Sequence, residues 1–184
     1  MPLSERWRDQ YERMLRSHRA LTAAAGPSAI GPDEARDTLY RFFQEAYHLK
    51  DWVKNSPTSH VHTAKAGAVV EDIFDSAAGL PHMQITADIC NGIKHLVLTK
   101  RTKTGDNATA VDSQSVAVGL PTFVTRVVYP GSPAERNPQP EPTETPSVEY
   151  RWTISSNGQT FDAIDIANKV VAEWQDWLQA KKLL

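Results

Sequence analysis

The sequence predicts a mainly helical α+β fold, an array of about five helices with a small antiparallel β-sheet inserted before the C-terminal helix. Three observations predict it. Apolar residues recur at intervals of three and four through most of residues 1–98 and again in residues 161–184. Between these parts, residues 148–154 alternate between apolar and polar side chains, the period of a half-buried strand. The chain has 184 residues and 40% hydrophobic composition, which is enough for one domain with its own core.

We expect residues 1–184 to form a single domain with three consecutive parts. Residues 1–98 form the helical part, residues 99–160 the β insertion, and residues 161–184 a C-terminal helix that packs back on the helical part. The insertion contains a proline-rich loop at 130–147, which holds six of the twelve prolines. Such a segment buries too little apolar surface to order itself, so an exposed connection is expected.

The bulk composition restricts the classes of function. A net charge of −2 argues against a generally basic nucleic-acid binder but leaves room for a local basic patch. The single cysteine, Cys90, excludes an intramolecular disulfide and fits a reducing compartment. Charged residues stand where a signal peptide would need an apolar run, and no stretch approaches the ~20 apolar residues of a membrane span. We therefore expect a soluble, cytoplasmic protein.

The first predicted helix follows Ser4, a residue suited to the N-cap position. Its apolar stripe, expected to pack on a neighbouring helix, is Trp7, Tyr11, Met14, His18 and Leu21. Five arginines occupy the remaining surface: Arg6, Arg8, Arg13, Arg16 and Arg19. They are able to contact phosphate. Glu5, Asp9 and Glu12 lie among them, however, and intrahelical ion pairs are the commoner explanation of such spacing.

The second predicted helix begins at Pro32 and ends at about Asn55, because Ser56-Pro57 stops it. Its apolar face is Leu39, Phe42, Phe43, Ala46, Leu49 and Val53. Its polar side carries Arg41, Glu45, His48, Asp51, Trp52 and Asn55. His48 and Asp51 lie one turn apart, so the carboxylate can orient the imidazole. The large Trp52 ring indicates that this side of the helix is partly covered.

A third helix is expected over Val69–Ala77 and a fourth over Met83–Val97. The apolar stripe of the fourth helix is Ile85, Ile89, Ile93 and Leu96, and its polar stripe is Asp88, Asn91, Lys94 and His95. A short helix with this much apolar content has little surface left for solvent. Its polar stripe is therefore expected to face something specific.

The remaining elements follow from local signals. Strands are expected at Val116–Val118, at Phe123–Tyr129 and over residues 148–154. The strand at Phe123–Tyr129 is expected to pair antiparallel with residues 148–154 across the proline-rich loop. Asn157-Gly158 predicts a turn, and Asp162 is placed to cap the last helix. The stripe of that helix is Ile164, Ala167, Val171, Trp174 and Leu178, widened by Val170 and Trp177.

The candidate catalytic residues come from the second and fourth helices: His48, Asp51, Asp88, Asn91, Lys94 and His95. If the two polar sides oppose each other, these groups converge on one cleft suited to general acid–base chemistry. The alternatives are a divalent-cation site, made by His48, Asp51, Asp88 and His95, or an inert buried polar network. No phosphate-binding loop, zinc-binding cysteine set or nucleophile elbow is present in the sequence, and no cofactor is expected.

Two stretches of the helical part resemble sequences of a known protein family. Tyr47-His-Leu-Lys-Asp-Trp52 and Asp88-Ile-Cys-Asn-Gly-Ile-Lys-His-Leu96 resemble the signature stretches of a family of small bacterial proteins of unknown activity. This resemblance covers the helical half well and the sheet loosely, and it implies no mechanism. The chain also resembles, more loosely, the HEPN superfamily of helical bacterial proteins.

Many HEPN proteins are metal-independent RNases of toxin–antitoxin and antiphage systems, and many act as dimers with a shared cleft. Their mark is an Arg followed on the same helix by a His. Arg41 and His48 have a compatible spacing, but Phe42 stands where a polar residue is expected. Lys94-His95 has Lys in place of Arg, at a different spacing.

The function implied is an RNA-directed phosphodiesterase. His48 and His95 would exchange protons with the attacking 2′-hydroxyl and the leaving oxygen. Lys94 would stabilise the phosphorane, and Asp51 or Asp88 would orient a histidine. The RNA backbone would be bound by Lys100, Arg101, Lys103 and Arg41. A non-catalytic, antitoxin-like interaction module and a metal-assisted hydrolase are the alternatives, and RNA, a protein partner and a second copy of the chain are the expected partners.

Overall fold

The computed structural model describes residues 6–27, 30–56, 81–94, 110–119 and 147–184. The helices in these residues are α1 (Trp7–Ala25), α2 (Pro32–Asn55), α4 (Pro81–Lys94) and α5 (Ala163–Ala180). The strands are β1 (Ala110–Gly119), β2 (Ser147–Ser156) and β3 (Gln159–Asp162). The predicted mainly helical α+β class, with an antiparallel sheet before the C-terminal helix, is confirmed. None of the described helices is long and apolar enough to cross a membrane.

Several expected elements lie outside the described residues. They are the helix over Val69–Ala77, the strand over Phe123–Tyr129 and most of the proline-rich loop. The end of the fourth predicted helix, residues 95–97, also lies outside them. These expectations stay predictions.

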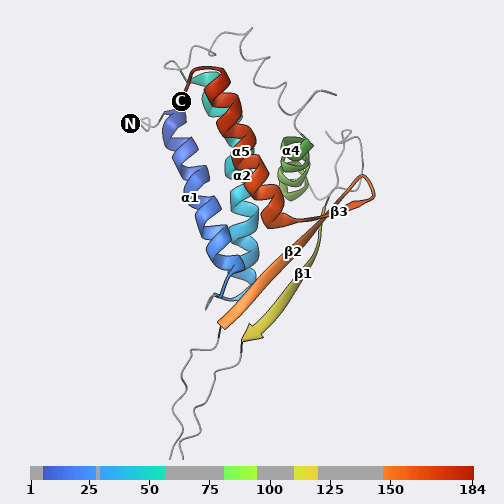
Figure 1. The fold of residues 1–184 in the computed structure, drawn as a ribbon. Coiled ribbons are helices and arrows are strands. Elements are labelled where there is room, and N and C mark those ends of the chain that lie inside the picture. The colour runs from blue at the N-terminus through green and yellow to red at the C-terminus, as the bar shows by residue number, and fades with distance from the viewer. Residues whose placement is uncertain (1–5, 28–29, 57–80, 95–109, 120–146) are drawn as a thin grey trace, which may run out of the picture.

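The helices form a bundle in which α1 and α2 are antiparallel neighbours, with α5 and α4 packed alongside (Figure 1). Helix α2 begins at Pro32 and ends at Asn55, as its local signals predict. Helix α1 begins at Trp7 with Arg6 at the N-cap position, so the prediction of Ser4 as the N-cap was wrong. The Asp9 carboxylate explains this boundary, because it accepts a hydrogen bond from the Arg6 backbone N–H at 2.6 Å.

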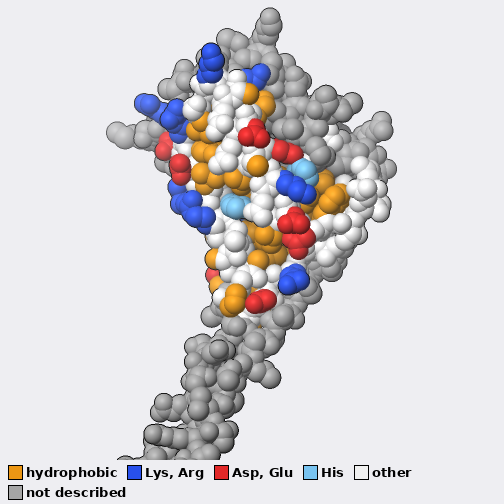
Figure 2. Space-filling view, in the orientation of Figure 1, with side chains coloured by type: hydrophobic (Ala, Val, Ile, Leu, Met, Phe, Trp, Pro, Cys, Tyr) orange, Lys and Arg blue, Asp and Glu red, His pale blue; other side chains and the backbone are white. Residues whose placement is uncertain are grey.

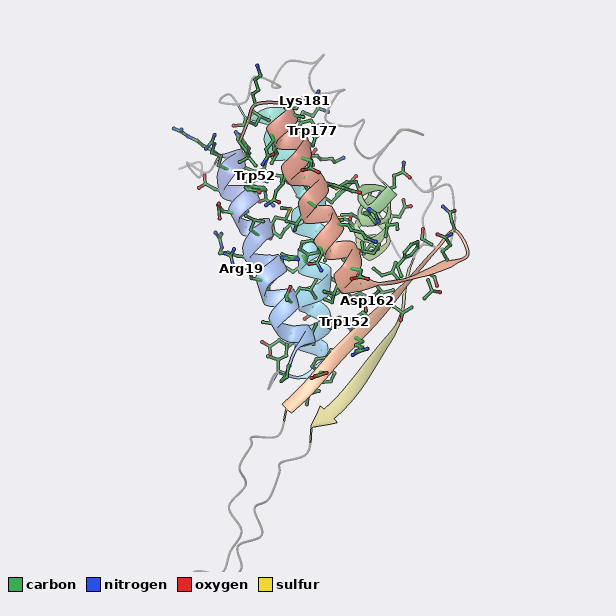
Figure 3. The ribbon with its side chains drawn as sticks, in the orientation of Figure 1. Arg19, Trp52, Trp152, Asp162, Trp177 and Lys181 are labelled. Atoms are coloured by element: carbon green, nitrogen blue, oxygen red, sulfur yellow. The ribbon has the colours of Figure 1, made fainter. Side chains whose placement is uncertain are left out.

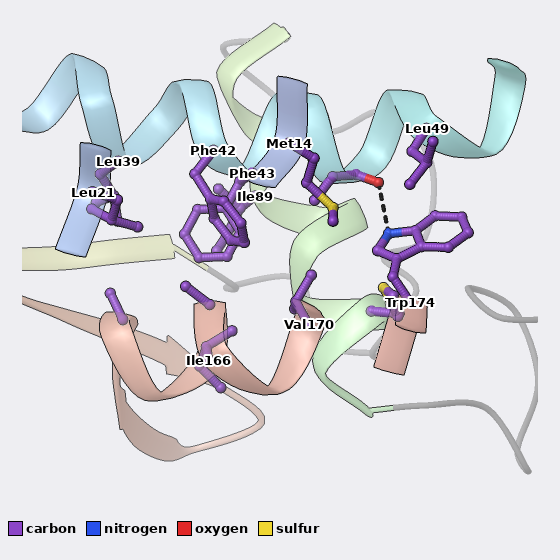
Figure 4. Close-up of a cluster of buried hydrophobic side chains, with 14 of the residues drawn as sticks. Met14, Leu21, Leu39, Phe42, Phe43, Leu49, Ile89, Ile166, Val170 and Trp174 are labelled. Carbon is purple, nitrogen blue, oxygen red and sulfur yellow. Dashed lines mark hydrogen bonds between the residues drawn. The ribbon is translucent and has the colours of Figure 1, made fainter. Parts of the chain in front are cut away.

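The core lies between the four helices and one face of the sheet (Figure 4). The apolar face predicted for α2 is fully buried along its length, and Met14 and Leu21 of α1 face it. The buried stripe of α5 is Ala163, Ile166, Ala167, Val170, Trp174 and Leu178. The predicted stripe missed Ile166, and it included Ile164 and Val171, which are only half-buried. The Trp174 indole N–H donates a hydrogen bond to the Ala46 carbonyl at 3.0 Å, which joins α5 to α2.

The sheet has the order β1-β2-β3, with every pair antiparallel. Strand β1 contains the predicted Val116–Val118 and begins earlier, at Ala110. It is β1 that pairs with β2, where the sequence predicted Phe123–Tyr129 as the partner. The alternation predicted for β2 is confirmed, because Tyr150, Trp152 and Ile154 are buried while Arg151 between them is exposed. The Tyr150 hydroxyl donates a hydrogen bond to the Ile30 carbonyl at 2.7 Å. This bond fixes the sheet to the start of α2.

The connection from β2 to α5 follows two local signals. Asn157 and Gly158 both have positive φ, 50° and 70°, which is the conformation of a type I′ hairpin turn. The turn produces β3, a short strand that the sequence did not predict. The Asp162 side chain accepts hydrogen bonds from the backbone N–H groups of Ile164 and Asp165, at 2.8 and 3.2 Å. Its predicted role as the cap of the last helix is confirmed.

Candidate functional site

The α2 members of the predicted site lie at the surface. Arg41, His48 and Asp51 all have exposed side chains. Arg41 and His48 are seven residues apart, nearly two helical turns, so they share one face of α2 about 10 Å apart along its axis. Asp51 lies one turn beyond His48. These three side chains are therefore open to solvent and are not covered by α4.

The α4 members are placed differently. Asp88 is only 1% exposed, and Asn91 is half-buried. Lys94 is the last residue of α4, and its side chain is not described. His95, Lys100, Arg101 and Lys103 lie outside the described residues. The structure thus puts Asp88 in the interior and His48 at the surface, so these two do not share one open cleft.

A metal site made by these residues has little support in the part of the chain that is described. No group of three or more His, Cys, Asp or Glu side chains in that part is arranged to hold a metal ion. His48, Asp51 and Asp88 are all described, so these three do not form such a group. The predicted cation site would need His95 and further residues outside the described ranges.

The structure does bring together a carboxylate and an imidazole that the sequence reasoning missed. Glu173 of α5 contacts the first turn of α4, where its Oε1 lies 2.6 Å from the Nδ1 of His82. Its Oε2 accepts a hydrogen bond from the Met83 backbone N–H at 3.2 Å. Glu173 therefore binds one of the free N–H groups at the start of α4 and orients the His82 ring.

Little in the sequence predicts the contact between Glu173 and His82. The two residues are 91 positions apart, and neither stands in a motif. Pro81 at the helix start predicts only that the next N–H groups need a partner. Chemically, a carboxylate that binds Nδ1 of an imidazole leaves Nε2 available for proton transfer. Both side chains are mostly buried, with 20% of the His82 side chain and 14% of the Glu173 side chain exposed.

Burial raises the pKa of the Glu173 carboxyl above its ordinary value of 4.5, although His82 and the Met83 N–H act in the opposite direction. The folded protein therefore holds a proton on Glu173 more tightly than the unfolded chain does. The resulting stabilisation is complete below pH 4.5 and is lost as the pH rises through the raised pKa of the folded state.

We expect Glu173→Gln to remove this pH dependence, because glutamine still offers an oxygen to the Met83 N–H but does not ionise. Urea unfolding from about pH 4 to about pH 7 should show wild type losing stability relative to the variant as the pH rises. Asp176→Asn, which removes an exposed carboxylate from the same helix, is the control for the change in net charge. A constant difference between wild type and Glu173→Gln across this range would contradict the assignment.

The arginines of α1 form the basic surface of the described part. Arg6, Arg8, Arg16 and Arg19 are exposed, and Figure 2 shows Lys and Arg side chains along the edge of the molecule where α1 lies. The intrahelical pairs expected for Arg8, Arg16 and Arg19 with Asp9 or Glu12 are absent from the described ranges. Glu5, the third expected acidic partner, lies outside these ranges.

Two of the groups expected to form these pairs, the Arg8 guanidinium and the Asp9 carboxylate, have other partners. Arg8 Nη2 donates to the Leu183 carbonyl at 2.8 Å, and the Asp9 carboxylate is bound to the Arg6 N–H. For the remaining arginines, an exposed pair contributes only about 0–1 kcal/mol, which does not fix a long side chain.

A polar cluster joins α1 to α2 beside this basic surface. Gln10, only 1% exposed, donates through Nε2 to the backbone carbonyl and to the carboxylate of Glu45, at 3.2 and 2.6 Å. Arg13 Nη1 donates to Gln10 Oε1 at 2.6 Å, and its guanidinium lies 5.8 Å from the centre of the Trp52 ring. The prediction that the Trp52 side of α2 is partly covered is confirmed, with α1 as the element that contacts it.

No family model matches the sequence, and no curated protein and no solved structure is significantly similar to it. The two resemblances noted in the sequence therefore stay expectations.

Proposed function

We propose that the protein is an RNA-directed phosphodiesterase of the HEPN-like kind and that its reactive face is the exposed side of α2. The observation that supports this most is the placement of Arg41 and His48 on one solvent-facing row of a single helix. A guanidinium remains charged at all relevant pH values and suits a phosphate, while an exposed imidazole can exchange a proton with a ribose hydroxyl.

The sequence proposed two carboxylates, Asp51 and Asp88, as the group that orients a histidine, and their burial favours one of them. Asp88 is buried within α4, whereas Asp51 is exposed one turn from His48 on α2. Asp51 is therefore the carboxylate that we assign to orient His48. His95, Lys94 and the basic run of Lys100, Arg101 and Lys103 keep the roles proposed for them, as the second imidazole, the phosphorane-stabilising ammonium and the backbone contacts.

The test is cleavage of unstructured RNA by highly purified protein. The double variant His48→Ala, His95→Ala is expected to lose at least about 10²-fold in rate, since each positioned histidine contributes about 10²–10⁴-fold. Gln44→Ala changes a polar residue of the same helix to which the proposal gives no role, and it should cleave as wild type does. Unchanged cleavage by the double variant, at equal purity, would overturn the proposal.

A second candidate is a non-catalytic interaction module. It is favoured by the separation of the candidate residues, with His48 exposed and Asp88 in the interior. In the same assay this candidate predicts no cleavage by wild type. It also predicts a stoichiometric complex with another protein of the native host. A stoichiometric transition metal in the purified protein would instead favour metal-assisted hydrolysis.

A further inference from the structure

Trp52 is a large aromatic side chain of α2 that is only half-buried, and Figure 3 shows it beside α1. It follows His48 by four residues, and His48 follows Arg41 by seven. Residues at these spacings lie above one another on a helix, so the three form one row. A row that combines a guanidinium, an imidazole and an indole has the composition of a surface that contacts single-stranded nucleic acid.

The environment of Trp52 holds the indole in place. The Arg13 guanidinium from α1 lies 5.8 Å from the ring centre, and Arg13 itself is bound to Gln10 at 2.6 Å. Gln10 is in turn buried and bound to Glu45 of α2. This chain of contacts runs from α2 through α1 and back to Trp52. The indole is thus partly ordered before any ligand arrives, which lowers the entropy cost of binding.

The charges around the row indicate on which side a phosphate backbone would lie. Asp51 precedes Trp52 by one residue, so it points about 100° away around the helix. On the side of Trp52 that α1 contacts, the Arg13 guanidinium lies 5.8 Å from the ring centre and the Glu45 carboxylate is bound to α1. Helical spacing places Asp9, four residues before Arg13, and Arg16, three residues after it, on the same face of α1 as Arg13. The Asp51 carboxylate repels a polyanion on its own side of the row, so the phosphates are expected on the side of Trp52 where the Arg13 guanidinium lies.

We propose that Trp52 is a stacking platform for a nucleobase of single-stranded RNA, with Arg13 and Arg16 contacting the flanking phosphates. This inference rests on the proposed function, because it supplies the substrate-binding surface for the Arg41–His48 row. The inference adds that the RNA substrate is single-stranded where it binds. The strand must be unpaired at the base that stacks, because a base inside a duplex offers no free face.

The test measures binding separately from cleavage. The probe is a fluorescently labelled oligoadenylate in which every 2′-hydroxyl is methylated, so that it cannot be cleaved by attack of that hydroxyl. Replacing Trp52 with Leu is expected to weaken binding about 5- to 150-fold, the range found when a stacking aromatic is removed. Trp52→Phe keeps a flat ring and should retain most of the affinity.

The chain offers a matched control in Trp177 of α5. This indole is also half-buried and also lies beneath a cation, with Lys181 Nζ 5.9 Å from the ring centre. Trp177→Leu should bind as wild type does. The inference is overturned if wild type does not bind the probe, if Trp52→Leu binds as well as wild type, or if Trp177→Leu is weakened equally.

The two proposals fail in distinguishable ways. If binding depends on Trp52 but RNA cleavage does not depend on His48 and His95, the stacking role of Trp52 stands and the proposed phosphodiesterase activity is overturned. If cleavage depends on these histidines but binding does not depend on Trp52, the phosphodiesterase proposal stands and the stacking role is overturned. Thermal unfolding of each variant checks that a loss of binding does not come from a loss of fold.

Discussion

Replacing Trp174 with alanine is expected to lower the free energy of unfolding by about 3–5 kcal/mol. The indole is fully buried where α5 packs against α2, and the side chains of Met14, Leu49 and Val170 lie around it (Figure 4). Its loss leaves a cavity at the centre of the bundle, because the surrounding helices can collapse only in part. It also removes the hydrogen bond from the indole N–H to Ala46.

Urea unfolding at neutral pH measures this effect, and the neighbouring Trp177 provides the comparison. The two ring centres are 5.8 Å apart and the rings are edge to face, but Trp177 is only half-buried. We expect Trp177→Ala to cost clearly less than Trp174→Ala, and Gln175→Ala, at an exposed position between them, to stay within about 0.5 kcal/mol of wild type. Equal losses for Trp174→Ala and Trp177→Ala would mean that the α5–α2 contact is not the centre of the core.

The parts of the fold that the sequence predicted are those determined by neighbours along the chain. The boundaries of α2 follow from Pro32 at one end and Ser56-Pro57 at the other. The turn at Asn157-Gly158 and the cap at Asp162 depend on residues within three positions. Periodicity also predicted the buried face of α2, because helical geometry alone decides which residues share a face.

The parts that the sequence did not predict depend on how the elements are rotated against one another. The contacts of Glu173 with His82 and of Arg8 with Leu183 join residues 91 and 175 positions apart. No local spacing encodes such contacts.

The candidate site shows the same limit. Periodicity placed Asp88 and His48 each on a polar stripe, but it could not tell that one stripe is turned inward and the other outward. Burial of Asp88 needs no catalytic explanation, since an ionisable group can be enclosed by packing wherever it finds polar partners.

The other large loss of stability is expected on β2, where Trp152→Ala should lower the free energy of unfolding by about 3–5 kcal/mol. Trp152 is 1% exposed, stacks on Tyr150 with ring centres 6.0 Å apart, and belongs to the same buried cluster as the helices. Removing it therefore weakens the attachment of the whole sheet to the bundle and not only one strand.

The neighbouring residue supplies a control that tests the register of β2. Arg151 is adjacent in sequence but points to the opposite face and is exposed, so Arg151→Ala should change the free energy of unfolding by no more than about 0.5 kcal/mol. Both variants are measured by urea unfolding under the same conditions. If Trp152→Ala cost no more than Arg151→Ala, the sheet would be a poorly attached appendage. The hydrogen bond from Tyr150 to Ile30 would then have to hold it without help from the core.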